Sequence, residues 1–192
     1  VIHIDIDPSS IGKNIDAHFK LAKFEIAGGD LDAALRDVNA AYDLKKDDPQ
    51  ILALRAAILF RLNDREGARS DAEKALALDP DNPDAHGILA ADQIALNHPD
   101  AALQFVDRGL EADPSNLGLL LLKLKIYEDK KDNKELEAVL RQIIASHSEL
   151  KPLRQALLLL LTSQNRLDEA EAEMRAMLKA TPNDTALALD LV

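Results

Sequence analysis

One spacing of 34 residues recurs along this chain from residue 15 to residue 184. Small or apolar residues hold matching positions in successive units. The three clearest series are Ala22, Ala56, Ala90, Leu124, Leu158; Ala34, Ala68, Ala102, Leu136, Ala170; and Ala41, Ala75, Gly109, Ile143, Met177. A fixed period of this length is typical of a solenoid, in which each unit buries its apolar face against its neighbours. The period therefore predicts an extended surface for binding rather than an enclosed pocket for chemistry.

Each unit is predicted to hold two helices separated by a short polar break. In the third unit these helices are expected over 83–96 and 99–112. Asn82 precedes Pro83 and Asp48 precedes Pro49, and a capping residue followed by proline is a strong helix start. The predicted repeats are 15–48, 49–82, 83–116, 117–150 and 151–184, with 185–192 beginning a sixth and 1–14 forming an extended or disordered leader.

The composition favours helices and argues against a nucleic-acid partner and a membrane span. The apolar residues are mostly Ala and Leu, which lose little side-chain entropy in a helix. The net charge of −11 argues against a nucleic-acid partner, which needs a basic face. The longest apolar run, Leu157 to Leu161, is far shorter than the roughly 20 residues of a membrane span.

The ends of the sequence leave its compartment undefined. It contains no Cys and no visible targeting signal, begins at Val1 rather than Met, and stops at Val192 inside a helical pattern. We therefore expect it to be a piece of a longer protein, and its localisation is not predicted.

Three stretches resemble motifs of the tetratricopeptide repeat family. Residues 29–35 (GDLDAAL) and 166–171 (RLDEAE) are similar to its central motif, and 75–80 (ALALDP) is similar to its ending. The resemblance covers 15–184 and onward. It implies an all-α, right-handed superhelix of five complete helix–turn–helix repeats plus the start of a sixth.

The fourth repeat departs most from the family pattern. Leu124, Leu136 and Ile143 stand where the other repeats mostly have small residues. Small residues at these positions let paired helices approach closely, whereas large ones change the spacing or the crossing angle. We expect the superhelix to be least regular across 117–150.

The resemblance also implies a concave binding groove lined by the first helix of each repeat. An apolar stripe with a few cations suits an amphipathic helix or an extended apolar segment of another protein. Some of these side chains could instead pack helix against helix. The groove residues carried over are Phe19, Lys23, Ile26, Leu54, Phe60, Arg61, Ile88, Ile94, Leu122, Lys125 and Leu159.

Family members that grip a C-terminal carboxylate use Lys, Asn and Arg side chains at fixed groove positions. Here those positions hold Phe19, Lys23, Leu54, Asp84 and Ile88. Because a buried carboxylate needs charged and amide donors, this carboxylate clamp is not expected.

The leader resembles a different family over 14 residues. Val1 to Asp7 alternates apolar and polar residues, as a strand does, and 1–14 is similar to a stretch of acetolactate-synthase-type thiamine-diphosphate enzymes. The motif with which those enzymes hold thiamine and metal is absent from the sequence. No functional meaning is attached to this likeness.

No pattern predicts catalysis, a metal or a cofactor. No two of His3, His18, His86, His98 and His147 are spaced four residues apart on one helix, and no Gly-rich phosphate loop is present. The chain is therefore predicted to be a non-enzymatic scaffold that binds a protein segment in its groove. The alternative is self-assembly into homo-oligomers through repeat edges, where Leu187, Leu189 and Leu191 would leave an unmatched apolar surface.

Overall fold

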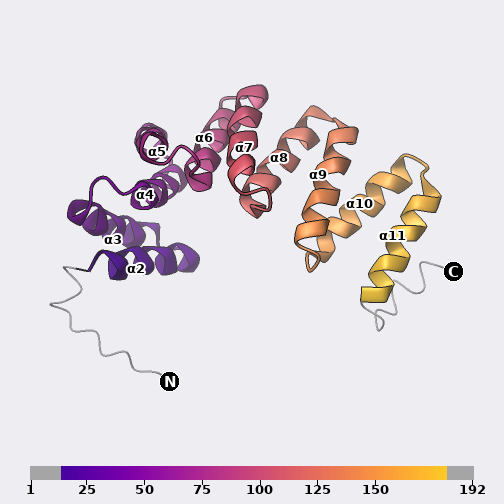
Figure 1. The fold of residues 1–192 in the computed structure, drawn as a ribbon, viewed down its shortest axis with the longest axis horizontal. Helices are drawn as coiled ribbons and strands as arrows, with labels where there is room; N and C mark the ends of the chain where they lie inside the picture. Colours follow the sequence, from indigo (N-terminus) through magenta and orange to yellow (C-terminus); the bar gives the residue numbers. More distant parts are fainter. Residues whose placement is uncertain (1–13, 181–192) are drawn as a thin grey trace, which may run out of the picture. The chain divides into compact units, whose positions relative to one another are not determined.

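A computed structural model describes residues 14–180, and this part contains ten helices and no strand (Figure 1). The predicted leader, up to residue 13, and the predicted sixth repeat lie outside the described residues. The helices are α2 (Ile15–Gly28), α3 (Leu31–Leu44), α4 (Pro49–Arg61), α5 (Arg65–Leu78), α6 (Pro83–Ala95), α7 (Pro99–Ala112), α8 (Leu117–Lys130), α9 (Asn133–Ser146), α10 (Lys151–Ser163) and α11 (Leu167–Ala180). The all-α prediction is confirmed.

The breaks between helices repeat one backbone conformation at the 34-residue spacing. The residue in the left-handed region is Gly29 after α2, and a non-glycine residue takes the same place after α4, α6, α8 and α10. Asparagine tolerates this conformation better than most residues, and it fills three of those four places. The series is Gly29, Asn63, Asn97, Lys131 and Asn165, with φ between 56° and 84°.

Helix starts follow the same spacing. The side chains of Asn14, Asp48, Asn82 and Asn116 each accept a hydrogen bond from a backbone N–H in the first turn of the helix that follows. These bonds satisfy donors that a helix start otherwise leaves unpaired. The predicted starts at Pro49 and Pro83 are confirmed.

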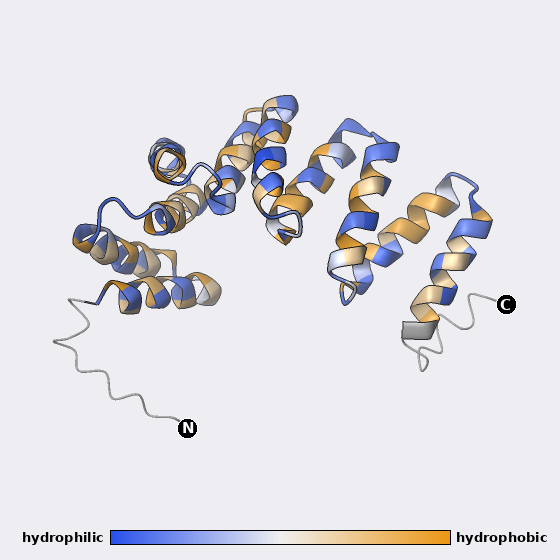
Figure 2. Cartoon of the chain, viewed as in Figure 1, coloured by the Kyte–Doolittle hydropathy of each residue, from blue (hydrophilic) through white to orange (hydrophobic). Residues whose placement is uncertain are grey.

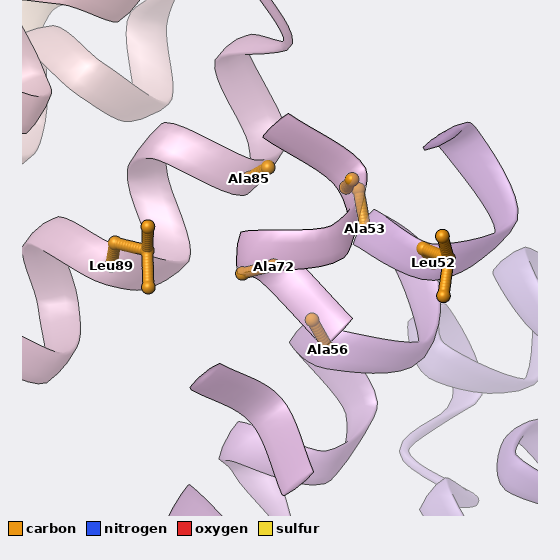
Figure 3. Packing of buried hydrophobic residues seen from close by; sticks show 7 residues of the cluster. Leu52, Ala53, Ala56, Ala72, Ala85 and Leu89 are labelled. Carbon is orange, nitrogen blue, oxygen red and sulfur yellow. The ribbon is translucent and has the colours of Figure 1, made fainter. Parts of the chain in front are cut away.

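Small residues dominate the buried cluster that α4, α5 and α6 share. This cluster joins the three helices through Leu52, Ala56 and Ala72, among others, and Figure 3 shows these side chains on their helices. A second cluster joins α2, α3 and α4, and a third joins α9, α10 and α11. Each cluster draws on three consecutive helices, which is the nearest-neighbour packing of a solenoid.

The structure forms two compact units, divided between Leu119 and Leu120 inside α8. We call them the N-terminal unit, up to Leu119, and the C-terminal unit, from Leu120. The helices in both carry hydrophobic and hydrophilic residues along their length (Figure 2). The repeat boundaries, and the irregularity expected over 117–150, stay predictions.

Candidate functional site

The residues predicted to line the groove lie on the first helix of each predicted repeat. In the N-terminal unit, α2 carries Phe19, Lys23 and Ile26, α4 carries Leu54, Phe60 and Arg61, and α6 carries Ile88 and Ile94. In the C-terminal unit, α8 carries Leu122 and Lys125, and α10 carries Leu159.

Four of these apolar side chains also contribute to helix packing. All four are half-buried; Phe19, Ile26 and Leu54 pack against the cluster of α2, α3 and α4, and Ile88 packs against the cluster of α4, α5 and α6. Only part of each side chain is therefore free to contact a partner. The packing role considered from sequence applies to these four residues.

Phe60 and Ile94 differ from that group. Both are half-buried, and neither belongs to the cluster of α2, α3 and α4 or to the cluster of α4, α5 and α6. They occupy equivalent positions 34 residues apart, near the C-terminal ends of α4 and α6. A substitution at either position is therefore expected to change the surface more than the core.

Two cations accompany these apolar residues. The Lys23 ammonium lies 4.8 Å from the centre of the Phe19 ring, within the range of a cation–π contact. One guanidinium nitrogen of Arg61 donates to the backbone oxygen of Ile26 at 3.4 Å and so ties the end of α4 to α2. Both residues are exposed, and neither forms an ion pair with a carboxylate in the part of the chain that the structure describes. They keep positive charge available on an acidic protein.

A small open cavity lies at the N-terminal ends of α2 and α4. Its volume is about 250 Å³, and Phe19 is the predicted groove residue that it includes. Its walls combine apolar side chains with both signs of charge. The lining residues are Ile15, Asp16, Phe19, Lys45, Asp48, Gln50 and Ile51.

In the C-terminal unit the predicted groove residues have surroundings that differ from those in the N-terminal unit. Lys125 donates to Asp129 at 2.7 Å on the same helix, so its charge is locally paired. Leu122 is half-buried, whereas Leu159 is 72% exposed. Leu159 is thus the most exposed apolar candidate of this unit.

Several partly buried polar contacts were not anticipated from the sequence. His18 on α2 bonds Asp37 on α3 at 2.6 Å, and Arg154 on α10 pairs with Glu173 on α11 at 3.6 Å. Both pairs are separated by 19 residues and occupy equivalent places in their repeats. The sequence contained a signal for these pairs, because the 34-residue period places His18 and Arg154 at one position of the repeat and Asp37 and Glu173 at another.

Two arginines of α5 hold one buried carboxylate of α6. Arg65 donates to one oxygen of Asp92 at 2.6 Å, and Arg69 donates to the other at 2.7 Å. Asp92 is only 1% exposed. In the same unit, Arg55 binds both oxygens of the buried Asp71, at 2.6 and 2.9 Å. These pairs join neighbouring helices and use their charges internally, so they are structural.

Glu25 gives a test of the polar contact between α2 and α3. Its Oε2 atom is buried without a hydrogen-bond partner in the described structure, and burial, followed by the nearby charge of Asp37, raises the pKa of Glu25. A raised carboxyl pKa means that ionisation of Glu25 opposes folding. The stability that the protonated carboxyl group contributes is therefore lost as pH rises through the raised pKa. We expect Glu25→Gln to stabilise the chain by about 1 kcal/mol near pH 7 and to have little effect near pH 4. Urea unfolding at both pH values measures the difference; equal effects at both would contradict the assignment.

Within residues 14–180, no group of three or more His, Asp or Glu side chains is arranged to hold a metal ion. No helix in the same range is both long and apolar enough to cross a lipid bilayer.

Comparison with known proteins relates this architecture to one family. Residues 59–126 match the family model described as tetratricopeptide repeat. The sequence matches none of the curated proteins. Among solved structures, TTC0263, a tetratricopeptide repeat protein of Thermus thermophilus, is 24% identical with a TM-score of 0.68, covering 93% of this chain and 97% of its own.

Two further structures share the fold at lower identity. PilW, a type IV pilus biogenesis factor, is 20% identical with a TM-score of 0.67, covering 86% of this chain and 76% of its own. YrrB, described as a tetratricopeptide repeat protein with an unusual peptide-binding site, is 14% identical with a TM-score of 0.55, covering 95% and 93%.

The described helices therefore have the fold of a solenoid built from helical repeats. Residues 59–126 match the tetratricopeptide repeat family by sequence, and the described helices share the fold of tetratricopeptide repeat structures over a wider range. Scaffolds of this family are typically non-enzymatic.

Proposed function

We propose that the N-terminal unit binds an apolar segment of another protein along α2, α4 and α6. The observation that carries this proposal is the set formed by Phe60, Ile94, Lys23 and Arg61. The two apolar side chains lie outside the described core clusters, and the two exposed cations have no carboxylate partner in the described residues. We call these four residues the groove set.

The groove set defines the chemistry of the partner. Phe60 and Ile94 suit apolar side chains that an amphipathic helix or an extended segment presents on one face. Lys23 and Arg61 favour an acidic residue beside that face, because opposite charges give orientation and speed association. YrrB, which shares this fold, is described as having a peptide-binding site, and this supports a peptide as the ligand here.

The proposed mode differs from recognition of a C-terminal carboxylate. Phe19, Leu54 and Ile88 occupy three of the positions where that recognition needs amide or charged donors, and all three are half-buried against the core. An internal segment with apolar anchors therefore fits this surface better than a free chain end. The function proposed is that of a non-enzymatic scaffold.

The test uses peptides selected from a random library on the full chain. The double substitution Phe60→Glu and Ile94→Glu is expected to weaken binding of the selected peptides by at least about 30-fold, or roughly 2 kcal/mol, because charge replaces apolar contact. Titration calorimetry measures the affinity, and circular dichroism confirms that helix content is retained.

The matched control is Leu78→Glu, which places the same charge on an exposed apolar residue of α5. This variant should bind the peptides as the parent chain does. Unchanged affinity in the double variant would place the binding surface elsewhere, and equal losses in both variants would mean that added charge alone explains the effect.

A further inference from the structure

The positive charge of the groove set is confined to two of its three helices. Lys23 lies on α2 and Arg61 on α4. The places on α6 that correspond to these two residues at the 34-residue spacing hold Ala91 and Ala95. Helix α6 contains neither Lys nor Arg, and its first turn carries the acidic Asp84. The surface therefore changes from positive over α2 and α4 to neutral or negative over α6.

A row of apolar side chains crosses the same three helices. Ile26, Phe60 and Ile94 are spaced 34 residues apart, take equivalent places on α2, α4 and α6, and are all half-buried. We call these three residues the apolar row. Helices α2 and α4 share one buried cluster, and α4 and α6 share another. Since packed helices lie about 8–10 Å apart, the ends of the apolar row are separated by roughly 16–20 Å.

Both cations lie beside the α2 end of the apolar row. Lys23 is one helical turn before Ile26, and its ammonium lies 4.8 Å from the centre of the Phe19 ring. The Arg61 guanidinium reaches from α4 to the backbone oxygen of Ile26 at 3.4 Å. An aromatic ring and a backbone oxygen hold these groups in place without neutralising them. Two unpaired charges therefore flank Ile26, whereas α6 supplies none beside Ile94.

We propose that the groove binds its partner in one orientation, with an Asp or Glu side chain of the partner over the α2 end of the apolar row and apolar side chains over Phe60 and Ile94. This inference rests on the proposed function and adds the place of the acidic residue, which lies outside the apolar anchors and on one side of them. A carboxylate placed over α6 would meet Ala91 and Ala95, which offer no donor to replace the water it loses, and the like charge of Asp84.

The net charge of the chain strengthens the argument for a single orientation. At −11, the protein as a whole repels an acidic segment. Local positive charge is therefore needed where the carboxylate docks, and α2 and α4 provide it. An arrangement that brings like charges together is disfavoured, so charge selects the orientation while the apolar contacts supply affinity.

The first test exchanges charge between protein and partner. The probes are peptides selected from the random library on the full chain whose binding requires Phe60 and Ile94. We expect them to share an Asp or Glu outside their apolar residues. Lys23→Glu should weaken these peptides at least about fivefold at low salt, mainly through slower association. Peptides with Lys in place of the acidic residue should reverse the order and bind Lys23→Glu more tightly than the parent chain.

The matched control is Lys125→Glu. Lys125 takes the place of Lys23 on α8, three 34-residue spacings later, and its ammonium already pairs with Asp129 at 2.7 Å in the C-terminal unit. This substitution changes the net charge by the same amount and should leave peptide binding unchanged. Equal losses in the two variants would assign the effect to net charge and overturn the proposal.

A photo-reactive benzoylphenylalanine next to the acidic residue of the peptide measures the orientation itself. After proteolysis, mass spectrometry should find its cross-links on α2 and α4, and the same group at the opposite end of the peptide should label α6. Cross-links from both ends to all three helices would overturn the proposal.

The outcomes separate this inference from the proposed function. Peptides that bind the Phe60→Glu and Ile94→Glu double variant as tightly as the parent chain would contradict the proposed function and the orientation with it. Peptides that need Phe60 and Ile94 but share no acidic residue, or that bind Lys23→Glu unchanged, would leave the groove in place and overturn the orientation alone.

Discussion

Replacing Arg65 and Arg69 together by alanine is expected to destabilise the N-terminal unit by about 3–5 kcal/mol, because a buried charge is left without a partner. Arg65 and Arg69 each bind a different oxygen of Asp92, which is 1% exposed. Water cannot replace both guanidinium groups at such a site without opening the packing of α5 on α6. Urea unfolding of the full chain, followed by circular dichroism at 222 nm, measures the loss.

Removing the carboxylate of Asp92 instead of the two arginines should destabilise the N-terminal unit less. In Asp92→Ala the two arginines lose the carboxylate, but Arg65 keeps its bond to the main-chain oxygen of residue 92. Their side chains are 31% and 42% exposed, so water can solvate them. Adding Asp92→Ile to the double arginine variant should restore most of the lost stability, since Ile58 fills the equivalent place on α4. A double arginine variant as stable as the parent, or no recovery with isoleucine, would show that this ion pair does not join the two helices.

The ion pair of Asp92 illustrates what the 34-residue period could and could not predict. The period placed the helices and the turns, because caps and left-handed residues are local signals. Asn82 before Pro83 and Asp48 before Pro49 both act as expected. Asp92 occupies a place where Ile58 is apolar, so the period alone gave no reason to expect a buried charge there.

The groove could be predicted only as a set of positions. The family pattern gives the face of each first helix, but the depth of a side chain depends on how its neighbours fill space. Phe19 and Leu54 therefore turn out to be partly engaged in core packing, whereas Phe60 and Ile94 lie outside the described clusters. Phe24, which the sequence did not single out, is exposed because no described helix covers it.

The second large loss of stability is expected from replacing a large buried residue of the fourth repeat. We expect Ile143→Ala to destabilise the C-terminal unit by about 2–5 kcal/mol. Ile143 is fully buried on α9, and its equivalents in the first two repeats are Ala41 and Ala75. Restoring the small residue usual at this place therefore opens a cavity rather than improving the packing.

The opposite exchange tests the same argument in the N-terminal unit. Ala75→Ile adds volume to the cluster of α4, α5 and α6, where Ala75 is fully buried, and should cost about 1–3 kcal/mol through overpacking. Urea unfolding of both variants gives the comparison. If Ile143→Ala were neutral, the neighbouring helices would have closed on the vacated space, and side-chain size would not set their separation. If both exchanges are costly, each repeat has fixed its own helix spacing, and the shared 34-residue period specifies the order of the helices but not their distances.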